Sequence, residues 1–171
     1  MARSLWCAVR HLKPRSVVET GVARGVTSRV ILEALAVNGG GGRLWSIDLP
    51  PLKEPWFSQG CSAVPQSLRG DWRYVCGSVR RILPRLLRRL ETIDLFVHDS
   101  LHTYDHMAFE FKLAQAYLSP TGLIVSDDIN TSRAFAEMVQ AGQALHGVAI
   151  TQERKQDAVV GIAWQTGPAR G

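Results

Sequence analysis

Two apolar stretches of this chain each end in aspartate. "IDLFVHDS" covers residues 93–100 and carries Asp99, and "GLIVSDD" covers 122–128 and ends in Asp127 and Asp128. On neighbouring parallel strands, spaced roughly 4.8 Å apart, these carboxylates would converge at one edge of a sheet. Like charges that close repel one another, so either one takes a proton or a cation lies among them. A divalent ion with oxygen ligands, magnesium above all, suits such a site and makes a bound hydroxyl easier to deprotonate.

His102 follows Asp99 by three residues. It suits the role of proton acceptor, because imidazole has the side-chain pKa closest to neutrality. A simpler interpretation stays open, in which the aspartates cap the helices that follow them and His102 lies in a cap or an exposed loop. That interpretation accounts for one aspartate at each place but not for the pair at 127 and 128. His98 points to the other side of its strand from Asp99 and is expected in the core, with a hydrogen bond.

A glycine turn follows the first apolar run, in "VVETGVARGVTS". Glu19, Gly21 and Gly25 form the pattern Glu-x-Gly-x-x-x-Gly at the carboxyl end of the expected strand, which is where ligands bind in open α/β sheets. Glycine lets the backbone approach a ligand, and free N–H groups at a helix start suit a carboxylate or phosphate. Asp48 ends the next strand, "RLWSID", where a carboxylate accepts hydrogen bonds from ribose hydroxyls. A nucleoside with an amino-acid tail would satisfy both features, although such turns and aspartates also occur as plain loop or cap residues.

Apolar runs alternate with segments of helical period, which is typical of a parallel sheet with helices on its faces. We expect strands near 16–21, 43–48, 72–77, 93–99, 122–127, 147–153 and 158–165, and helices over 3–12, 26–37, 79–90, 103–118 and 132–144. The last two strands lie too close in sequence for a crossover helix and should form an antiparallel hairpin at the edge of the sheet. Residues 50–70 form a long loop, in which Trp56 and Phe57, with Trp72 beyond it, act either as an apolar wall for a substrate or as anchors.

The bulk properties indicate one globular domain over 1–171, with an N-terminal helix in 1–15 and a frayed tail at 167–171. The net charge of +5 would favour binding to anionic partners. Along helix 79–90, Arg81, Arg85 and Arg88 form a stripe that we interpret as a solvated face. The three cysteines form no paired motif, and the sequence shows neither a signal peptide nor a membrane span. We therefore expect a cytoplasmic protein with reduced thiols and no membrane contact.

The order of these motifs resembles class I S-adenosylmethionine-dependent methyltransferases. Within that class, the chain is similar to the metal-dependent sugar and small-molecule O-methyltransferases grouped with cephalosporin hydroxylase-like proteins. The resemblance runs from about Ser16 to Asn130 and includes Asp99-x-x-His102-x-Tyr104 and "GLIVSDD". It implies an α/β fold, a Rossmann-like class I methyltransferase sandwich with a seven-stranded, mostly parallel sheet.

The resemblance also implies a role for each site residue. Glu19, Gly21 and Gly25 would shape the methionine end of the S-adenosylmethionine site, Asp48 would hold the ribose, Gly77 and Ser78 would lie beside the adenine, Asp99, Asp127 and Asp128 would bind Mg²⁺, and His102 would be the base. The substrate would be a small molecule with a hydroxyl group, and nucleic acid is disfavoured. Ser100 and Leu101 depart from the usual family residues, and the short segment before the first strand points to a trimmed member or to a homo-oligomer. The alternatives are a non-catalytic S-adenosylmethionine-binding module and an RNA methyltransferase.

Overall fold

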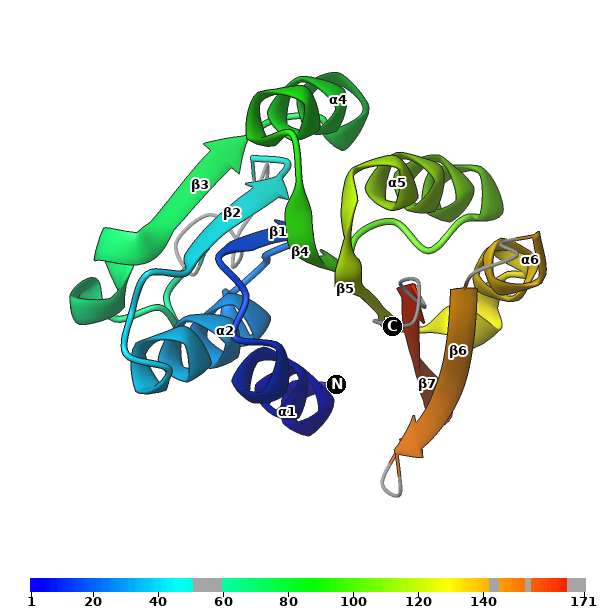
Figure 1. Cartoon of the computed structure of the whole chain (residues 1–171), viewed down its shortest axis with the longest axis horizontal. Coiled ribbons are helices and arrows are strands. Elements are labelled where there is room, and N and C mark those ends of the chain that lie inside the picture. The colour runs from blue at the N-terminus through cyan, green and yellow to red at the C-terminus, as the bar shows by residue number, and fades with distance from the viewer. Residues whose placement is uncertain (51–59, 142–144, 153–154, 166–171) are drawn as a thin grey trace, which may run out of the picture.

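The computed structural model describes residues 1–50, 60–141, 145–152 and 155–165. Its strands form one seven-stranded sheet in the order β3-β2-β1-β4-β5-β7-β6 (Figure 1). They are β1 Ser16–Thr20, β2 Arg43–Asp48, β3 Trp72–Cys76, β4 Ile93–His98, β5 Leu118–Ser126, β6 Leu145–Gln152 and β7 Lys155–Gln165. Strands β3, β2, β1, β4 and β5 are parallel, whereas β7 is antiparallel to both β5 and β6. The predicted sheet with its antiparallel edge hairpin is confirmed.

Helices cover both faces of this sheet (Figure 1). They are α1 Ala2–Leu12, α2 Val26–Val37, α4 Val79–Leu90, α5 Tyr104–Tyr117 and α6 Ala134–Ala141, with short 3-10 helices at Gln66–Asp71 and Ile129–Thr131. One core cluster joins α1 and α2 to the sheet through residues such as Leu5 and Ile31. A second joins α4, α5 and α6 to the other face through Leu83, Phe111 and Phe135. These two apolar layers hold the strand ends rigidly in place.

Several boundaries differ from the sequence expectation, most of all the one between α5 and β5. Helix α5 ends at Tyr117, and strand β5 begins at Leu118 rather than at 122, because Leu118 already has extended backbone and pairs with Ile93. Residues 66–71 form a 3-10 helix within the expected loop. Trp72 is buried and acts as an anchor, whereas Trp56 and Phe57 lie outside the described residues, as do 142–144 of the last expected helix and the tail from 166.

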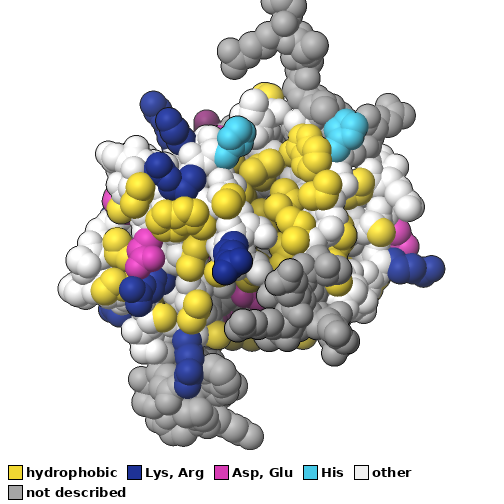
Figure 2. Space-filling view, turned by 90° about the horizontal axis from the view of Figure 1, so that it is seen from below, with side chains coloured by type: hydrophobic (Ala, Val, Ile, Leu, Met, Phe, Trp, Pro, Cys, Tyr) yellow, Lys and Arg dark blue, Asp and Glu magenta, His cyan; other side chains and the backbone are white. Residues whose placement is uncertain are grey.

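The surface carries both basic and hydrophobic side chains. Seen from below, hydrophobic side chains gather into a broad patch, with Lys and Arg mostly beside it (Figure 2). Exposed large hydrophobic residues include Trp6 on α1 and Val148 and Ile150 on β6. The cysteines are free, as expected. Over the part of the chain that the structure describes, no helix combines the length and the apolar character needed to cross a membrane.

Candidate functional site

The carboxyl ends of the five parallel strands are joined into one row by backbone hydrogen bonds. The amide of Asp99 donates to the carbonyl of Thr20 at 2.9 Å, and that of Asp127 donates to the carbonyl of His98 at 2.9 Å. On the other side of β1, the amide of Gly21 donates to Ile47 at 2.9 Å and that of Gly77 donates to Asp48 at 2.7 Å. The row therefore runs Gly77, Asp48, Gly21, Asp99, Asp127. The structure thus aligns the strand-end residues predicted from the sequence.

Gly21 is in direct contact with the segment that carries Asp99. Its φ is +82°, and a Cβ placed there would lie 1.9 Å from the carbonyl oxygen of Asp99. No side chain fits in that space. Gly25, with φ +81°, is the residue immediately before helix α2. Gly21 therefore lets the turn pass against the loop after β4, and Gly25 lets it pass against residues 61–64, where a Cβ would lie 2.9 Å from the Val64 side chain.

Asp48 holds the glycine turn in the described structure. Its Oδ2 accepts hydrogen bonds from the amides of Val22 at 2.9 Å and Ala23 at 2.8 Å, and its Oδ1 accepts one from the amide of Leu49 at 2.8 Å. The sequence predicted a ribose ligand here and missed these backbone contacts. A carboxylate offers about four acceptor positions, so the three amides leave room for a hydroxyl donor.

Glu19 lies fully buried beneath the turn. Its Oε2 accepts hydrogen bonds from the hydroxyls of Ser28 and Ser46, both at 2.6 Å, and the Trp72 indole N–H donates to Ser46 at 2.8 Å. Within the described chain, Oε1 has no hydrogen-bond partner. Burial raises the pKa of Glu19 to about 7, although the two serine hydroxyls act in the opposite direction. Glu19 therefore supports the turn from below and changes charge near neutral pH.

A cavity of about 270 Å³ lies above this row of strand ends. Gly21, Asp48, Ser78 and Asp99 line it, together with His106. Gly77 lines a neighbouring groove instead, with Ser78 shared between the two. The cavity thus brings together residues from the ends of β1, β2 and β4 and from the start of α4. Its place at the strand ends, beside a glycine turn and a helix start, fits a nucleoside with a carboxylate.

Asp99 and Asp127 form the acidic part of the site. Burial, together with the charges of Asp127, Glu19 and Asp128, raises the pKa of Asp99 to about 7, against a weak hydrogen bond from Thr27 that lowers it. Asp127 Oδ1 is buried and meets no polar partner among the described residues. Yet in the described ranges no three His, Cys, Asp or Glu side chains are grouped so as to hold a metal ion. The predicted Mg²⁺ ligands are neighbours, but they do not form a ready metal site.

The helix-cap interpretation of these aspartates is wrong. The residue before α5 is Thr103, not Asp99. Asp128 precedes the 3-10 helix Ile129–Thr131 in a left-handed conformation, with φ 46°, but its side chain makes no cap hydrogen bond. Instead, its backbone carbonyl accepts from the Thr131 hydroxyl at 2.7 Å. The carboxylates of both aspartates are therefore left for a role other than capping.

His102 stands beside this acidic group. Burial lowers the pKa of His102, and His98 lowers it further, while Asp128 and Asp127 act in the opposite direction. Its ring meets His98 edge to face, with centroids 5.3 Å apart. Nε2 of His102 is buried and has no hydrogen-bond partner in the part of the chain described. A neutral imidazole with a vacant nitrogen is what a proton acceptor requires.

Sequence reasoning missed Glu110, which is fully buried on α5. Its Oε2 accepts from the Thr20 hydroxyl at 2.6 Å and contacts His98 Nδ1 at 2.8 Å. Its Oε1 accepts from the Ser100 hydroxyl at 2.8 Å and lies 2.7 Å from His106 Nε2. His98 is thus a core residue with a hydrogen bond, as expected. Helical spacing could have indicated this burial, because position 110 lies on the same helix face as the buried positions 107, 111 and 114.

The fold and the strand-end site define a class I methyltransferase. A family model described as a methyltransferase domain matches residues 18–129, and the chain belongs to that family. The class that the sequence resembled is confirmed. No curated protein sequence matches the chain significantly.

Solved structures of several methyltransferases share the fold. The O-methyltransferase TomG from Streptomyces achromogenes, solved in complex with SAM, aligns with a TM-score of 0.80 at 19% identity, over 97% of this chain and 79% of TomG. An O-methyltransferase from Bacillus cereus with SAH aligns with a TM-score of 0.76 at 17% identity, over 96% of this chain and 80% of that one. A putative O-methyltransferase from Klebsiella pneumoniae aligns with a TM-score of 0.76 at 17% identity, over 97% and 80% of the two chains.

Proposed function

We propose that this methyltransferase transfers a methyl group from S-adenosylmethionine to a hydroxyl group of a small molecule. The observation that carries the proposal is the contact of Gly21 with the Asp99 backbone. Through that contact the glycine turn after β1 and the loop after β4 meet at one cavity, which Asp48 and Ser78 also line, and this arrangement supports the proposal. Solved proteins of the same fold, TomG and the Bacillus cereus enzyme, are O-methyltransferases with SAM and SAH bound.

The chain's residues fit this cofactor and the proton transfer. When bound, S-adenosylmethionine supplies an electrophilic methyl group on its sulfonium. The N–H groups at the start of α2 suit its carboxylate, and Asp48 retains capacity for a ribose hydroxyl. We assign the proton of the substrate hydroxyl to His102, whose Nε2 has no hydrogen-bond partner among the described residues and whose side chain lies beside the cavity rather than in its lining. Rate enhancement then comes mainly from holding the reactants in line and from the charges around the reacting oxygen.

Magnesium dependence belongs to the proposal as a separate, testable part. Two observations support it. The charges of Asp127 and Asp128 raise the pKa of Asp99, and Oδ1 of Asp127 has no hydrogen-bond partner among the described residues. Because the described residues do not present a three-ligand group, no step above relies on a metal. Turnover measured with and without a chelator, then with Mg²⁺ restored, tests this part. Equal rates in all three conditions would remove magnesium from the proposal and leave methyl transfer intact.

Two charge-removing variants test the acidic loop. D99N and D128N should bind S-adenosylhomocysteine about as tightly as the wild type does, as measured by calorimetry, because Asn has the size of Asp and the cavity that Asp99 lines keeps its shape. Their turnover should fall by roughly a hundredfold, as expected when charge stabilisation at the reacting oxygen is lost. D105N, which changes an exposed aspartate in the first turn of α5, is the matched control. Full turnover in D99N and D128N would contradict the proposed role.

The same measurements separate the alternative functions. S-adenosylhomocysteine binding without turnover on any hydroxyl acceptor would indicate a non-catalytic binding module. Methylation of RNA, with affinity that falls steeply as salt rises, would indicate an RNA methyltransferase. Absence of S-adenosylhomocysteine binding would overturn the proposal altogether.

We also propose that copies of the chain associate. The support is the hydrophobic patch of Figure 2 and the exposure of Val148 and Ile150 on β6, since contiguous apolar surface of this kind commonly marks an interface. Light scattering should give the mass of an oligomer for the wild type and of a monomer for I150K. A wild-type monomer would contradict the proposal.

A further inference from the structure

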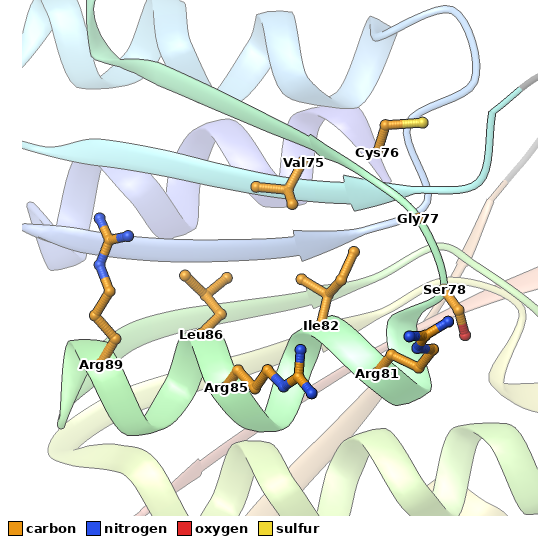
Figure 3. Close-up of a pocket in the computed structure, with 9 residues that line it drawn as sticks. All are labelled: Val75, Cys76, Gly77, Ser78, Arg81, Ile82, Arg85, Leu86 and Arg89. Atoms are coloured by element: carbon orange, nitrogen blue, oxygen red, sulfur yellow. The ribbon is translucent and has the colours of Figure 1, made fainter.

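A groove of about 460 Å³ lies between strand β3 and helix α4, beside the strand-end cavity, with which it shares Ser78 (Figure 3). Val75 on β3 and Ile82 and Leu86 on α4 form its apolar walls, and both α4 side chains point toward the strand. Because β3 is the terminal strand of the sheet order, no further strand closes the outer side of the groove among the described elements. As far as the described residues go, the groove is therefore open to solvent along that edge.

Three arginines on α4 line the same groove: Arg81, Arg85 and Arg89. A spacing of four residues places them on one helix face, with a rise of about 6 Å from each to the next. The helix contains no acidic residue. In the described structure, none of the three guanidinium groups has a hydrogen-bond or ion-pair partner, whereas the guanidinium of the neighbouring Arg88 donates to the carbonyl of Pro84 at 3.2 Å. The sequence grouped Arg88 with this stripe, but the groove is lined by Arg89 instead.

Unpaired guanidinium groups around an apolar cleft create a local positive potential that attracts anions. Guanidinium forms paired hydrogen bonds with phosphate, sulfonate or carboxylate groups, and the volume lies within the usual range for small-molecule sites. The groove lining contains no aromatic residue on which nucleic-acid bases could stack. These properties favour a small amphipathic anion over a nucleic acid strand.

We propose that the β3–α4 groove binds a small organic anion with a flat or aliphatic apolar body and two or more phosphate, sulfonate or carboxylate groups. The anionic groups pair with Arg81, Arg85 and Arg89, and the apolar body lies against Ile82 and Leu86. The ligand is distinct from the methyl acceptor, since β2 and β1 separate β3 from β4, a distance of roughly 14 Å at the usual strand spacing. Ser78 lies at the boundary between this groove and the proposed cofactor cavity.

The test uses naphthalene disulfonate as the probe, with binding measured by calorimetry on the full chain. The wild type should bind it, and R85Q should bind it about tenfold more weakly, as expected when one charge-assisted contact is lost. R88Q removes the same charge from the same helix outside the groove and should change affinity by less than about twofold. S-adenosylhomocysteine binding by R85Q should equal that of the wild type, which shows that the fold and the cofactor cavity are intact.

Three results would overturn the inference. The first is no binding of the probe to the wild type, and the second is equal weakening by R85Q and R88Q, which would indicate only a general surface charge. The third is displacement of the probe by a short single-stranded RNA that binds more tightly than the probe does. A steep decrease of the RNA affinity with salt would then assign the groove to nucleic acid. None of these results bears on methyl transfer, which is measured independently.

Discussion

Glu110 anchors the loop that carries the acidic and basic groups of the site. Burial by itself raises the pKa of Glu110, but hydrogen bonds from His106 and His98 outweigh burial, and the pKa falls to about 2. The carboxylate is therefore ionised and accepts from donors on β1, β4, α5 and the loop at Ser100. Ser100 lies between Asp99 and His102, so Glu110 positions both of them without contacting the proposed substrate.

Replacing Glu110 by Gln should destabilise the protein at pH 7 by about 2–4 kcal/mol. Both carboxylate oxygens of Glu110 accept hydrogen bonds, and the substitution replaces one of them by an amide nitrogen that cannot accept. The folded pKa of about 2 lies below the ordinary 4.5, so this stabilisation is present above 4.5 and is lost as pH falls toward 2. Urea unfolding of wild type and E110Q at neutral pH and at about pH 3 should show the difference shrink. E91Q, at the exposed residue that follows α4, is the control, and a constant difference at both pH values would contradict the assignment.

The glycine turn after β1 and the loop after β4 act as one unit, because their backbones touch at Gly21 and Asp99. Asp48 at the end of β2 secures the same turn through the amides of Val22 and Ala23. The cofactor side and the acidic side of the site are therefore coupled through contacts between neighbouring elements. A change in the turn should displace the loop as well.

Two glycines with almost the same backbone angle allow a controlled test of that coupling. Gly21 has φ +82° and would place a Cβ against Asp99, whereas Gly40 has φ +80° with nothing within 4 Å. Each change to Ala costs about 1–2 kcal/mol for the left-handed conformation. G21A should lose roughly 2 kcal/mol more through the steric clash. It should also bind S-adenosylhomocysteine at least about tenfold more weakly. Denaturant unfolding and calorimetry measure both effects, and equal behaviour of G21A and G40A would contradict the coupling.

The stability of the whole molecule should depend on pH through Glu19. Its pKa in the folded protein is about 7 against an ordinary 4.5, because burial disfavours the ionised form. A raised pKa contributes stability that is fully present below 4.5 and is lost as pH rises through 7. The pKa of Asp99 is raised from 3.8 to about 7, so the stability that protonated Asp99 contributes to the protein is also lost as pH rises through 7.

The isosteric change E19Q should remove the share of this pH dependence that belongs to Glu19. At about pH 8, E19Q should be more stable than the wild type by roughly 3 kcal/mol, and the advantage should disappear below about pH 4.5. Thermal or urea unfolding across this pH range measures the difference. E91Q again provides the control for an exposed carboxylate. An advantage of E19Q that did not vary with pH would contradict the raised pKa.

Much of the architecture and part of the site could be predicted from local pattern. The strand-end positions of Asp48, Asp99 and Asp127 followed from apolar runs that stop at a polar residue, and the antiparallel hairpin followed from a short connection. The hydrogen bonds of Glu110 could not be predicted, because its partners come from segments up to 90 positions away in the sequence. Arg89 rather than Arg88 lines the groove because of the rotation of α4 about its axis relative to β3. The helical spacing of the arginines in the sequence does not determine that rotation.

The sequence by itself determined the alternation of strands and helices, the glycines that permit the turn and the acidic residues that end the strands. These depend on periodicity and on backbone freedom, which are properties of neighbouring residues. Only the tertiary structure decided that Asp48 binds the turn and that Glu19 and Glu110 are buried with pKa values shifted in opposite directions. It also decided that, among the described residues, no three His, Cys, Asp or Glu side chains are grouped so as to hold a metal ion. Those outcomes depend on desolvation and on distances between side chains remote in sequence, and packing sets both.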